Sequence, residues 1–179
     1  MGNKTKFNFT VSVNLKKRIH EMNMKSEMFF LKRAIEIARQ GIRRGFGPFG
    51  AVIVKDGEII SEANNTVVLS HDPTAHAEVL AIRKASDILG SHDLTGCVLY
   101  CSCEPCPMCL GAIYWGGLTK VVYASDRFEA EASGFSDNLI YNEINLDPTR
   151  RKIEFEHKPE AGGDEVFRIW NETENKSRY

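Results

Sequence analysis

CSCEPCPMC, residues 101–109, packs four of the chain's five cysteines into nine positions. Cysteines at this density indicate a disulfide framework, a structural metal site or a catalytic metal site. An odd number of cysteines does not pair off completely, and thiols stay reduced in the cytosol. The sequence therefore favours a metal site over disulfides.

The composition of the whole chain indicates what kind of protein contains this site. Its 179 residues suit one compact domain, and 42% hydrophobic with 26% charged residues is ordinary for a globular protein. A formal net charge of −1 gives no global positive field for nucleic acid, and no apolar run reaches the length of a membrane span. No signal-peptide pattern opens the chain, so we expect a cytoplasmic protein that makes no contact with membranes.

The N-terminal half contains two helical patterns and one hairpin. Residues 1–25 are polar and basic, and we expect an extension, either an edge strand over FNFTVSV or a flexible tail, ahead of a domain over residues 26–179. Apolar residues then recur at helical spacing from Ser26, a candidate N-cap, to about Arg44. AVIV and EIIS flank Asp56-Gly57, which predicts two antiparallel strands.

The following elements define the fold class. A second helix is predicted from about residues 72–74 to Gly90, followed by a buried strand (CVLYCS), a short helix (CLGAIYWGG), another strand (KVVYAS) and a final helix near the C-terminus. This order indicates a layered α/β domain with helices on both faces of a mixed sheet.

Two helix starts carry the residues that a metal needs. Cys106 and Cys109 lie three positions apart and share one face of a first turn, where the helix N-terminus stabilises thiolates. In TAHAE, His76 and Glu78 open the preceding helix. At a helix start, His76 can bind a metal while the longer side chain of Glu78 reaches around to the same point.

One histidine and two cysteines suit zinc and leave its fourth coordination position open. Zinc lowers the pKa of a bound water to roughly 7, and Glu78, as a carboxylate that is not a ligand, can transfer that water's proton. His76-Ala77-Glu78 followed by Pro105-Cys106-Pro107-Met108-Cys109 is the H-x-E…P-C-x-x-C signature of zinc nucleobase deaminases. The spacing therefore predicts a catalytic zinc site.

A closed structural zinc site is the alternative. Cys103 would supply its fourth ligand, because Cys103 and Cys106 also have C-x-x-C spacing, but Glu78 would then have no role. Cys97 and Cys101 lie in an apolar strand and are interpreted as core residues.

The chain from about Phe29 to Tyr179 resembles the bacterial guanine deaminases of the cytidine-deaminase-like superfamily. The matching stretches are GPFGAVIVKDG, SHDPTAHAEVLAIRKA, SCEPCPMCLGAIYW, GFSDNLIYNEI and the terminal SRY. The zinc residues are common to the superfamily, whereas GFSD and the C-terminal tyrosine are specific to this group.

The resemblance implies a fold and a cofactor. The fold is a three-layer α/β/α arrangement around a mixed five-stranded sheet. The cofactor is one Zn²⁺ per subunit, bound by His76, Cys106 and Cys109.

The resemblance also implies a reaction and a pocket. Guanine would be hydrolysed to xanthine and ammonia, in purine catabolism or salvage, with Glu78 carrying protons and Asp137 contacting the amino edge of the base. The remaining pocket residues would be Asn65, Phe49, Trp115 and Tyr179. Tyr179 would come from the partner of a homodimer that exchanges C-terminal segments; without the resemblance, Trp115 reads as a core residue.

Three rival functions stay open on the sequence. A guanosine deaminase, or a deaminase of another aminated purine or triazine, would share the zinc residues. A tRNA adenosine deaminase would need a positive surface for phosphates, which the net charge of −1 disfavours. A non-catalytic zinc-stabilised domain would not need Glu78.

Overall fold

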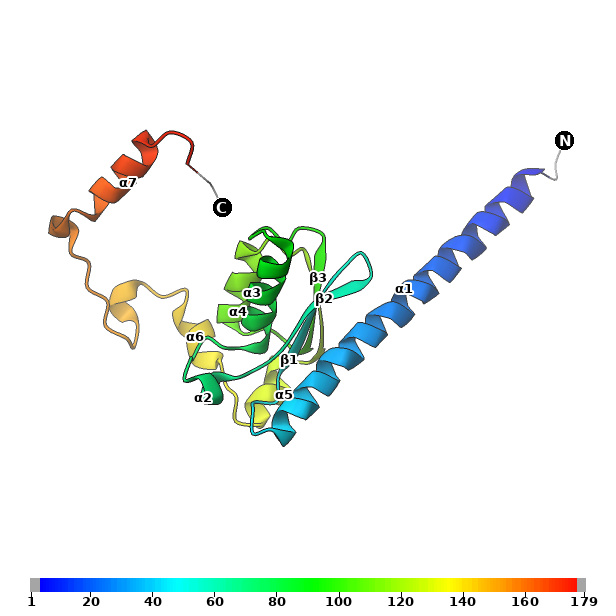
Figure 1. The fold of residues 1–179 in the computed structure, drawn as a ribbon, viewed down its shortest axis with the longest axis horizontal. Coiled ribbons are helices and arrows are strands. Elements are labelled where there is room, and N and C mark those ends of the chain that lie inside the picture. The colour runs from blue at the N-terminus through cyan, green and yellow to red at the C-terminus, as the bar shows by residue number, and fades with distance from the viewer. Residues whose placement is uncertain (1–3, 177–179) are drawn as a thin grey trace.

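The computed structural model describes the backbone of residues 4–176 and the side chains of residues 24–176. The elements, in chain order, are α1 (Lys4–Arg43), β1 (Gly50–Lys55), β2 (Glu58–Asn64), α2 (Val67–Ser70), α3 (Ala77–Leu89), β3 (Cys97–Cys103), α4 (Pro107–Trp115), β4 (Lys120–Ser125), α5 (Arg127–Ala132), α6 (Asn138–Glu143), the 3₁₀ turns η1 (Pro148–Arg150) and η2 (Pro159–Ala161), and α7 (Gly163–Glu172). Figure 1 shows the sheet at the centre, with α1 and the C-terminal segment extending away from it on opposite sides.

The described residues form one mixed sheet of four strands in the order β2-β1-β3-β4. β1 runs antiparallel to both β2 and β3, and α4 carries the chain across to β4, which is parallel to β3. The expectation of a fifth strand is wrong. Beyond β4 the chain enters α5 at once, because Asp126 accepts hydrogen bonds from the Phe128 and Glu129 amides and Glu129 accepts one from the Asp126 amide.

Both faces of the sheet are covered, which confirms the predicted three layers. On β1, Ala51 and Ile53 belong to the core that α3 and α4 complete, whereas Val52 and Val54 belong to the core against α1. Alternate residues of a strand point to opposite faces, so β1 contributes to two separate apolar layers. α1 lies along one face and α3 with α4 on the other (Figure 1).

The predicted hairpin is confirmed. Asp56 and Gly57 have φ values of 51° and 83° and join β1 to β2. A two-residue turn with positive φ at both positions matches the right-handed twist of the strands, and Asp-Gly is suited to it.

α1 begins earlier than the sequence predicts. The expected start at Ser26 is wrong, and residues 4–25 continue the same helix and form no edge strand. From Lys4 to Gln40 the chain contains no Gly or Pro, so no residue of the backbone interrupts the helical hydrogen bonds. Arg33 holds the helix against β2 through two hydrogen bonds of 2.6 Å to Glu62.

The second major helix starts later than predicted. The short α2 intervenes, and Asp72 does not cap α3 but accepts hydrogen bonds of 2.7 Å from the Thr74 amide and hydroxyl. α3 then starts with His76 as its N-cap and ends at Gly90, whose φ of 63° confirms the predicted stop.

The C-terminal segment leaves the body of the domain. The final helix predicted from the sequence is present as α7, but every residue from 152 to 175 is exposed. Figure 1 shows α7 standing apart from the sheet and its covering helices. Among the helices of the described residues, none combines the length and hydropathy that a membrane span requires.

Candidate active site

The starts of α3 and α4 converge at one end of the sheet. His76 is the N-cap of α3 and Cys106 the N-cap of α4, and both have extended backbone conformations. Cys109 follows in the first turn of α4, whose first residue is Pro107. Proline suits that position because its missing N–H would have no partner inside the helix.

The spacing of the three side chains fits a zinc ion. The His76 Nδ1 atom lies 3.6 Å from Cys106 Sγ and 3.5 Å from Cys109 Sγ, and the two sulfurs are 3.6 Å apart. Zinc–sulfur and zinc–nitrogen bonds of roughly 2.3 and 2.0–2.1 Å at tetrahedral angles separate ligand atoms by about 3.6–3.8 Å. These residues also form the one such ligand cluster in the described part of the chain.

The electrostatics of the triad favour a bound cation. The hydrogen bonds that join Cys106 to Cys109 and to His76 lower the pKa of Cys106, against the effect of burial. The same contact with Cys106, together with burial, raises the pKa of Cys109, so the two sulfurs share a proton that a metal would replace.

Glu78 lies beside the triad and is 6% exposed. Burial raises the pKa of its carboxyl group, and the nearby Cys106 thiolate acts in the same direction. Burial therefore favours the protonated carboxyl group more than water would, and a proton taken up by Glu78 is held near the metal ligands.

A cavity of about 340 Å³ opens in front of this cluster. Its walls come from the loop before β1, the segment after β2, the start of α3, the β3–α4 loop, α5, and α6 with the loop that precedes it. They consist of Gly47, Phe49, Asn65, Val67, Val68, His76, Glu78, Cys103, Glu104, Cys106, Arg127, Ala130, Phe135, Ser136, Asp137 and Ile140. The volume is at the small end of the range for ligand pockets, roughly 300–1,000 Å³.

Most of the site residues singled out from the sequence meet in this cavity. Phe49, Asn65 and Asp137 line it together with Glu78 and two of the metal ligands. Trp115 does not line it: it ends α4 and is 71% exposed, which also contradicts its interpretation as a core residue. Tyr179 lies outside the described residues.

Asp137 lines the cavity from the start of α6. It is the N-cap residue of α6 and is half-buried. Burial raises the pKa of its carboxyl group, the Cys106 thiolate adds to this, and Arg127 opposes it.

Sequence reasoning missed several residues that line the cavity, among them Phe135, Glu104 and Arg127. Phe135 packs edge-to-face on Phe49, with ring centroids 5.0 Å apart. Its place in the GFSD stretch is a sequence signal that could have identified it. Glu104 and Arg127 had no sequence signal beyond their positions beside the metal loop and after β4.

The remaining cysteines are not ligands in this arrangement. Cys103 donates a hydrogen bond from its thiol to the Asp126 carbonyl, at 3.6 Å, and is absent from the metal cluster. Cys97 and Cys101 are 1% exposed, as expected of core residues, and all five cysteines are free. The structure therefore favours the three-ligand site over the closed one.

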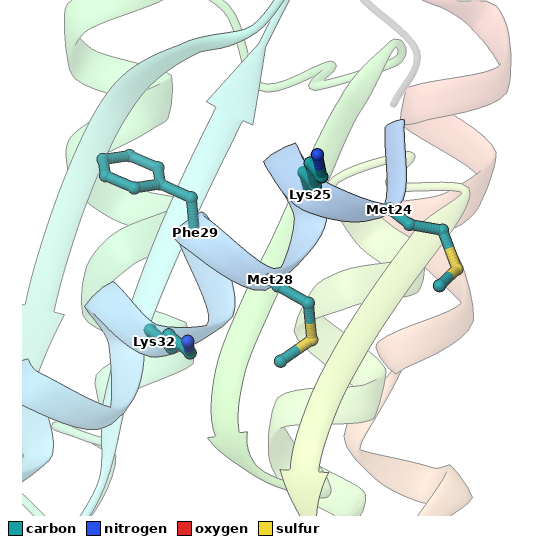
Figure 2. Close-up of a pocket in the computed structure, with 5 residues that line it drawn as sticks. All are labelled: Met24, Lys25, Met28, Phe29 and Lys32. Atoms are coloured by element: carbon teal, nitrogen blue, oxygen red, sulfur yellow. The ribbon is translucent and has the colours of Figure 1, made fainter. Parts of the chain in front are cut away.

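A second hollow lies on the surface of α1, far along the chain from the metal ligands (Figure 2). Its lining residues all come from one helix: Met24, Lys25, Met28, Phe29 and Lys32. It contains no carboxylate, histidine or thiol, so the metal chemistry belongs to the cavity at the starts of α3 and α4.

Residues 24–125 match the family model of the cytidine and deoxycytidylate deaminase zinc-binding region. The chain therefore belongs to this family of zinc-dependent deaminases, and His76, Cys106 and Cys109 form its zinc site.

Within the family, the chain is similar to the guanine deaminase of Bacillus subtilis, with 51% identity over 84% of this chain and 97% of that protein. The crystal structure of guanine deaminase from Bacillus subtilis superimposes with a TM-score of 0.83, covering 85% of this chain and 98% of the other at 50% identity. A tRNA-specific adenosine deaminase of Aquifex aeolicus is 37% identical over 78% of this chain and 89% of its own length.

Proposed function

We propose that this protein is a guanine deaminase that converts guanine and water to xanthine and ammonia. The observation that carries the reaction is the meeting of the zinc triad, buried Glu78 and Asp137 around one cavity. The substrate is supported by 51% identity along nearly the full length of the Bacillus subtilis guanine deaminase.

Zinc, when bound by the triad, makes hydroxide available near neutral pH. Glu78 accepts one proton from the attacking water on a carboxylate oxygen and passes it to the ring nitrogen N3 as the C2–O bond forms. It then carries the remaining hydroxyl proton to the amino nitrogen on C2, so that the C2–N bond breaks, the nitrogen leaves as ammonia and a C2 carbonyl remains. The burial that raises the pKa of Glu78 suits this shuttle, because the group must hold the proton between the two transfers.

The opposite wall supplies the contacts that would select guanine. Asp137 accepts hydrogen bonds from the N–H groups along the amino edge of the base. Asn65 accepts a hydrogen bond from the Val67 amide on its Oδ1 atom, at 3.2 Å, which directs its amide nitrogen to donate to an acceptor on the ring. The crossed rings of Phe49 and Phe135 form an apolar wall for the plane of the base.

The C-terminal segment completes the site of a second copy in this proposal. Val166, Phe167, Ile169 and Trp170 of α7 are 43–71% exposed, and the segment extends away from its own sheet. Apolar side chains gathered on one short helix require a partner surface. A homodimer that exchanges these segments covers them and brings the Tyr179 end of the chain to the partner's pocket.

The test is ammonia release from guanine, guanosine, adenine and cytosine, measured side by side on zinc-loaded protein. We expect release from guanine. The Glu78→Gln variant should lose about 100- to 10,000-fold in kcat, the usual range for a general acid–base, and should keep its zinc content. Glu58→Gln, at the exposed start of β2, is the matched control and should keep full activity.

The other outcomes separate the rival functions. Release from guanosine alone would keep the zinc chemistry and move the substrate to the nucleoside. Inosine formed in tRNA, with no release from free bases, would indicate the tRNA-editing function. An unchanged Glu78→Gln variant would exclude the proposed proton transfer.

A further inference from the structure

Arg127 connects the side of the cavity formed by the metal loop with the side formed by α6. It is the first residue of α5, and its amide donates a 3.1 Å hydrogen bond to the Glu104 carboxylate. Glu104 in turn donates its own amide to the Ser125 carbonyl, at 2.8 Å, and lies two positions before the zinc ligand Cys106. Through its backbone, Arg127 is thus fixed to the metal loop.

The side chain of Arg127 contacts α6, on the other side of the cavity. Its guanidinium carbon lies 4.5 Å from the centre of the Tyr141 ring and 4.9 Å from that of Phe128. Tyr141 is in α6, and its amide donates to the Asp137 carbonyl at 3.2 Å, one turn earlier. The cation–π contact between this guanidinium and the Tyr141 ring links α5 to α6 and restrains α6, and with it Asp137.

Charge adds to this restraint. Three charged or titratable groups outside α6 interact electrostatically with Asp137: Cys106 from the metal site, Glu104 from the metal loop and Arg127 from α5. Of these, Arg127 alone lowers the pKa of Asp137, while Tyr141 shares its helix and interacts with both. A cation at this point favours the ionised carboxylate that the substrate contact requires.

We infer that Arg127 is a positioning residue, which ties the Asp137 wall of the cavity to the zinc loop and keeps the Asp137 carboxylate in place. This assignment rests on the proposed function, in which Asp137 contacts the amino edge of the base. Arg127 acts through Asp137 and not on the reacting atoms.

A double-mutant cycle tests the assignment. Arg127→Met removes the charge and the planar stack, Asp137→Asn removes the carboxylate, and the double variant combines them. Arg127→Met should lower kcat/KM for guanine by about 10- to 100-fold, the cost of misplacing an active-site group. In the Asp137→Asn background the same change should lower kcat/KM by no more than about twofold, because Arg127 acts through the Asp137 carboxylate.

Two further variants separate positioning from simple loss of structure. Arg127→Lys keeps the charge without the stack and should recover part of the lost kcat/KM. Arg44→Met removes a guanidinium that lies 4.7 Å from the Phe46 ring, outside the cavity lining, and should leave kcat/KM unchanged. If the loss of kcat/KM in the double variant equals the product of the losses in the two single variants, the inference is overturned.

An independent measurement holds even if guanine is not the substrate. In zinc-loaded protein with ¹³C-labelled aspartate, the Asp137 carboxyl signal is assigned by its loss in Asp137→Asn. Its titration midpoint should rise in Arg127→Met and stay unchanged in Arg44→Met. An unmoved midpoint would overturn the inference, whereas wild-type protein without activity on guanine would overturn the proposed function alone.

Discussion

At the scale of single residues, the same side-chain type serves opposite purposes depending on its surroundings. Cys106, at a helix start with His76 and a neighbouring thiol, has a lowered pKa and suits a metal ligand. Cys103, only three positions earlier, lies at the end of a strand, where burial raises the pKa of its thiol to about 11. The chemistry of each cysteine therefore follows from its place and not from its membership of the cluster.

This contrast predicts how the thiols react. With a pKa of about 11, Cys103 holds about one thousandth of its population as thiolate at pH 8. The thiolate is the form that reacts, so alkylation of Cys103 by iodoacetamide should be slow at pH 8 and rise about tenfold per pH unit toward pH 11. Mass spectrometry of zinc-loaded protein over a short reaction time measures this.

The zinc ligands provide the internal comparison. After chelation of the metal, Cys106 should be labelled at pH 8 well before Cys103. Rapid labelling of Cys103 at pH 8 in the zinc-loaded protein would contradict the burial that raises its pKa.

At the scale of elements, the close approach of α1 to β1 depends on one missing side chain. A Cβ atom at Gly50, the first residue of β1, would lie 2.3 Å from the Ala34 carbonyl oxygen and 2.7 Å from the Ala38 amide nitrogen. Both atoms belong to the backbone of α1, so neither can move aside as a flexible side chain would. The apolar layer between α1 and the sheet is therefore built around glycine at this position.

Gly50→Ala should lower the free energy of unfolding by about 1–3 kcal/mol, because helix and strand must separate to accept the methyl group. Gly111→Ala is the matched control: nothing lies within 4 Å of the added Cβ in α4, and alanine should stabilise the helix by about 0.5–1 kcal/mol. Urea unfolding of the zinc-loaded variants measures both. Equal effects of the two substitutions would contradict the packing of α1 on β1.

At the scale of the whole molecule, the segments near the two ends of the chain extend away from the domain that lies between them. The N-terminal part of α1 and the segment that carries α7 both leave the three-layer domain in Figure 1. The C-terminal segment bears large exposed apolar side chains, and in the proposed dimer it belongs to the neighbouring subunit.

Exchange predicts that two defective chains restore each other. A chain truncated after residue 162 keeps its zinc site but lacks α7, and should be monomeric and nearly inactive. The Glu78→Gln chain lacks the proton carrier but keeps α7. When the two are unfolded and refolded together, mixed dimers should recover activity at the intact zinc site of the truncated chain.

Light scattering measures the mass of each species, and ammonia release from guanine measures recovery. Each variant refolded alone is the control. Full activity of the truncated chain by itself, or a mixture that gains nothing over the separate proteins, would contradict the exchange.

Much of the site could be predicted because its signals are local. The Asp56-Gly57 turn, the stop at Gly90, and the placement of His76, Cys106 and Cys109 at helix starts each depend on a few adjacent residues. Zinc restricts its ligands to few side-chain types at close spacing, and a short stretch of sequence records both.

Other features depended on residues that are distant in the chain. No adjacent pattern places Arg127 between Glu104 and Tyr141, moves Trp115 out of the cavity, continues α1 back to Lys4 or ends the sheet at four strands. By itself, the sequence determined the metal chemistry, the hairpin and the alternation of helix and strand, since these follow from local backbone preference and ligand type. The tertiary structure alone decided which loops form the second wall of the cavity, because that wall exists only once α5 and α6 pack beside the zinc loop.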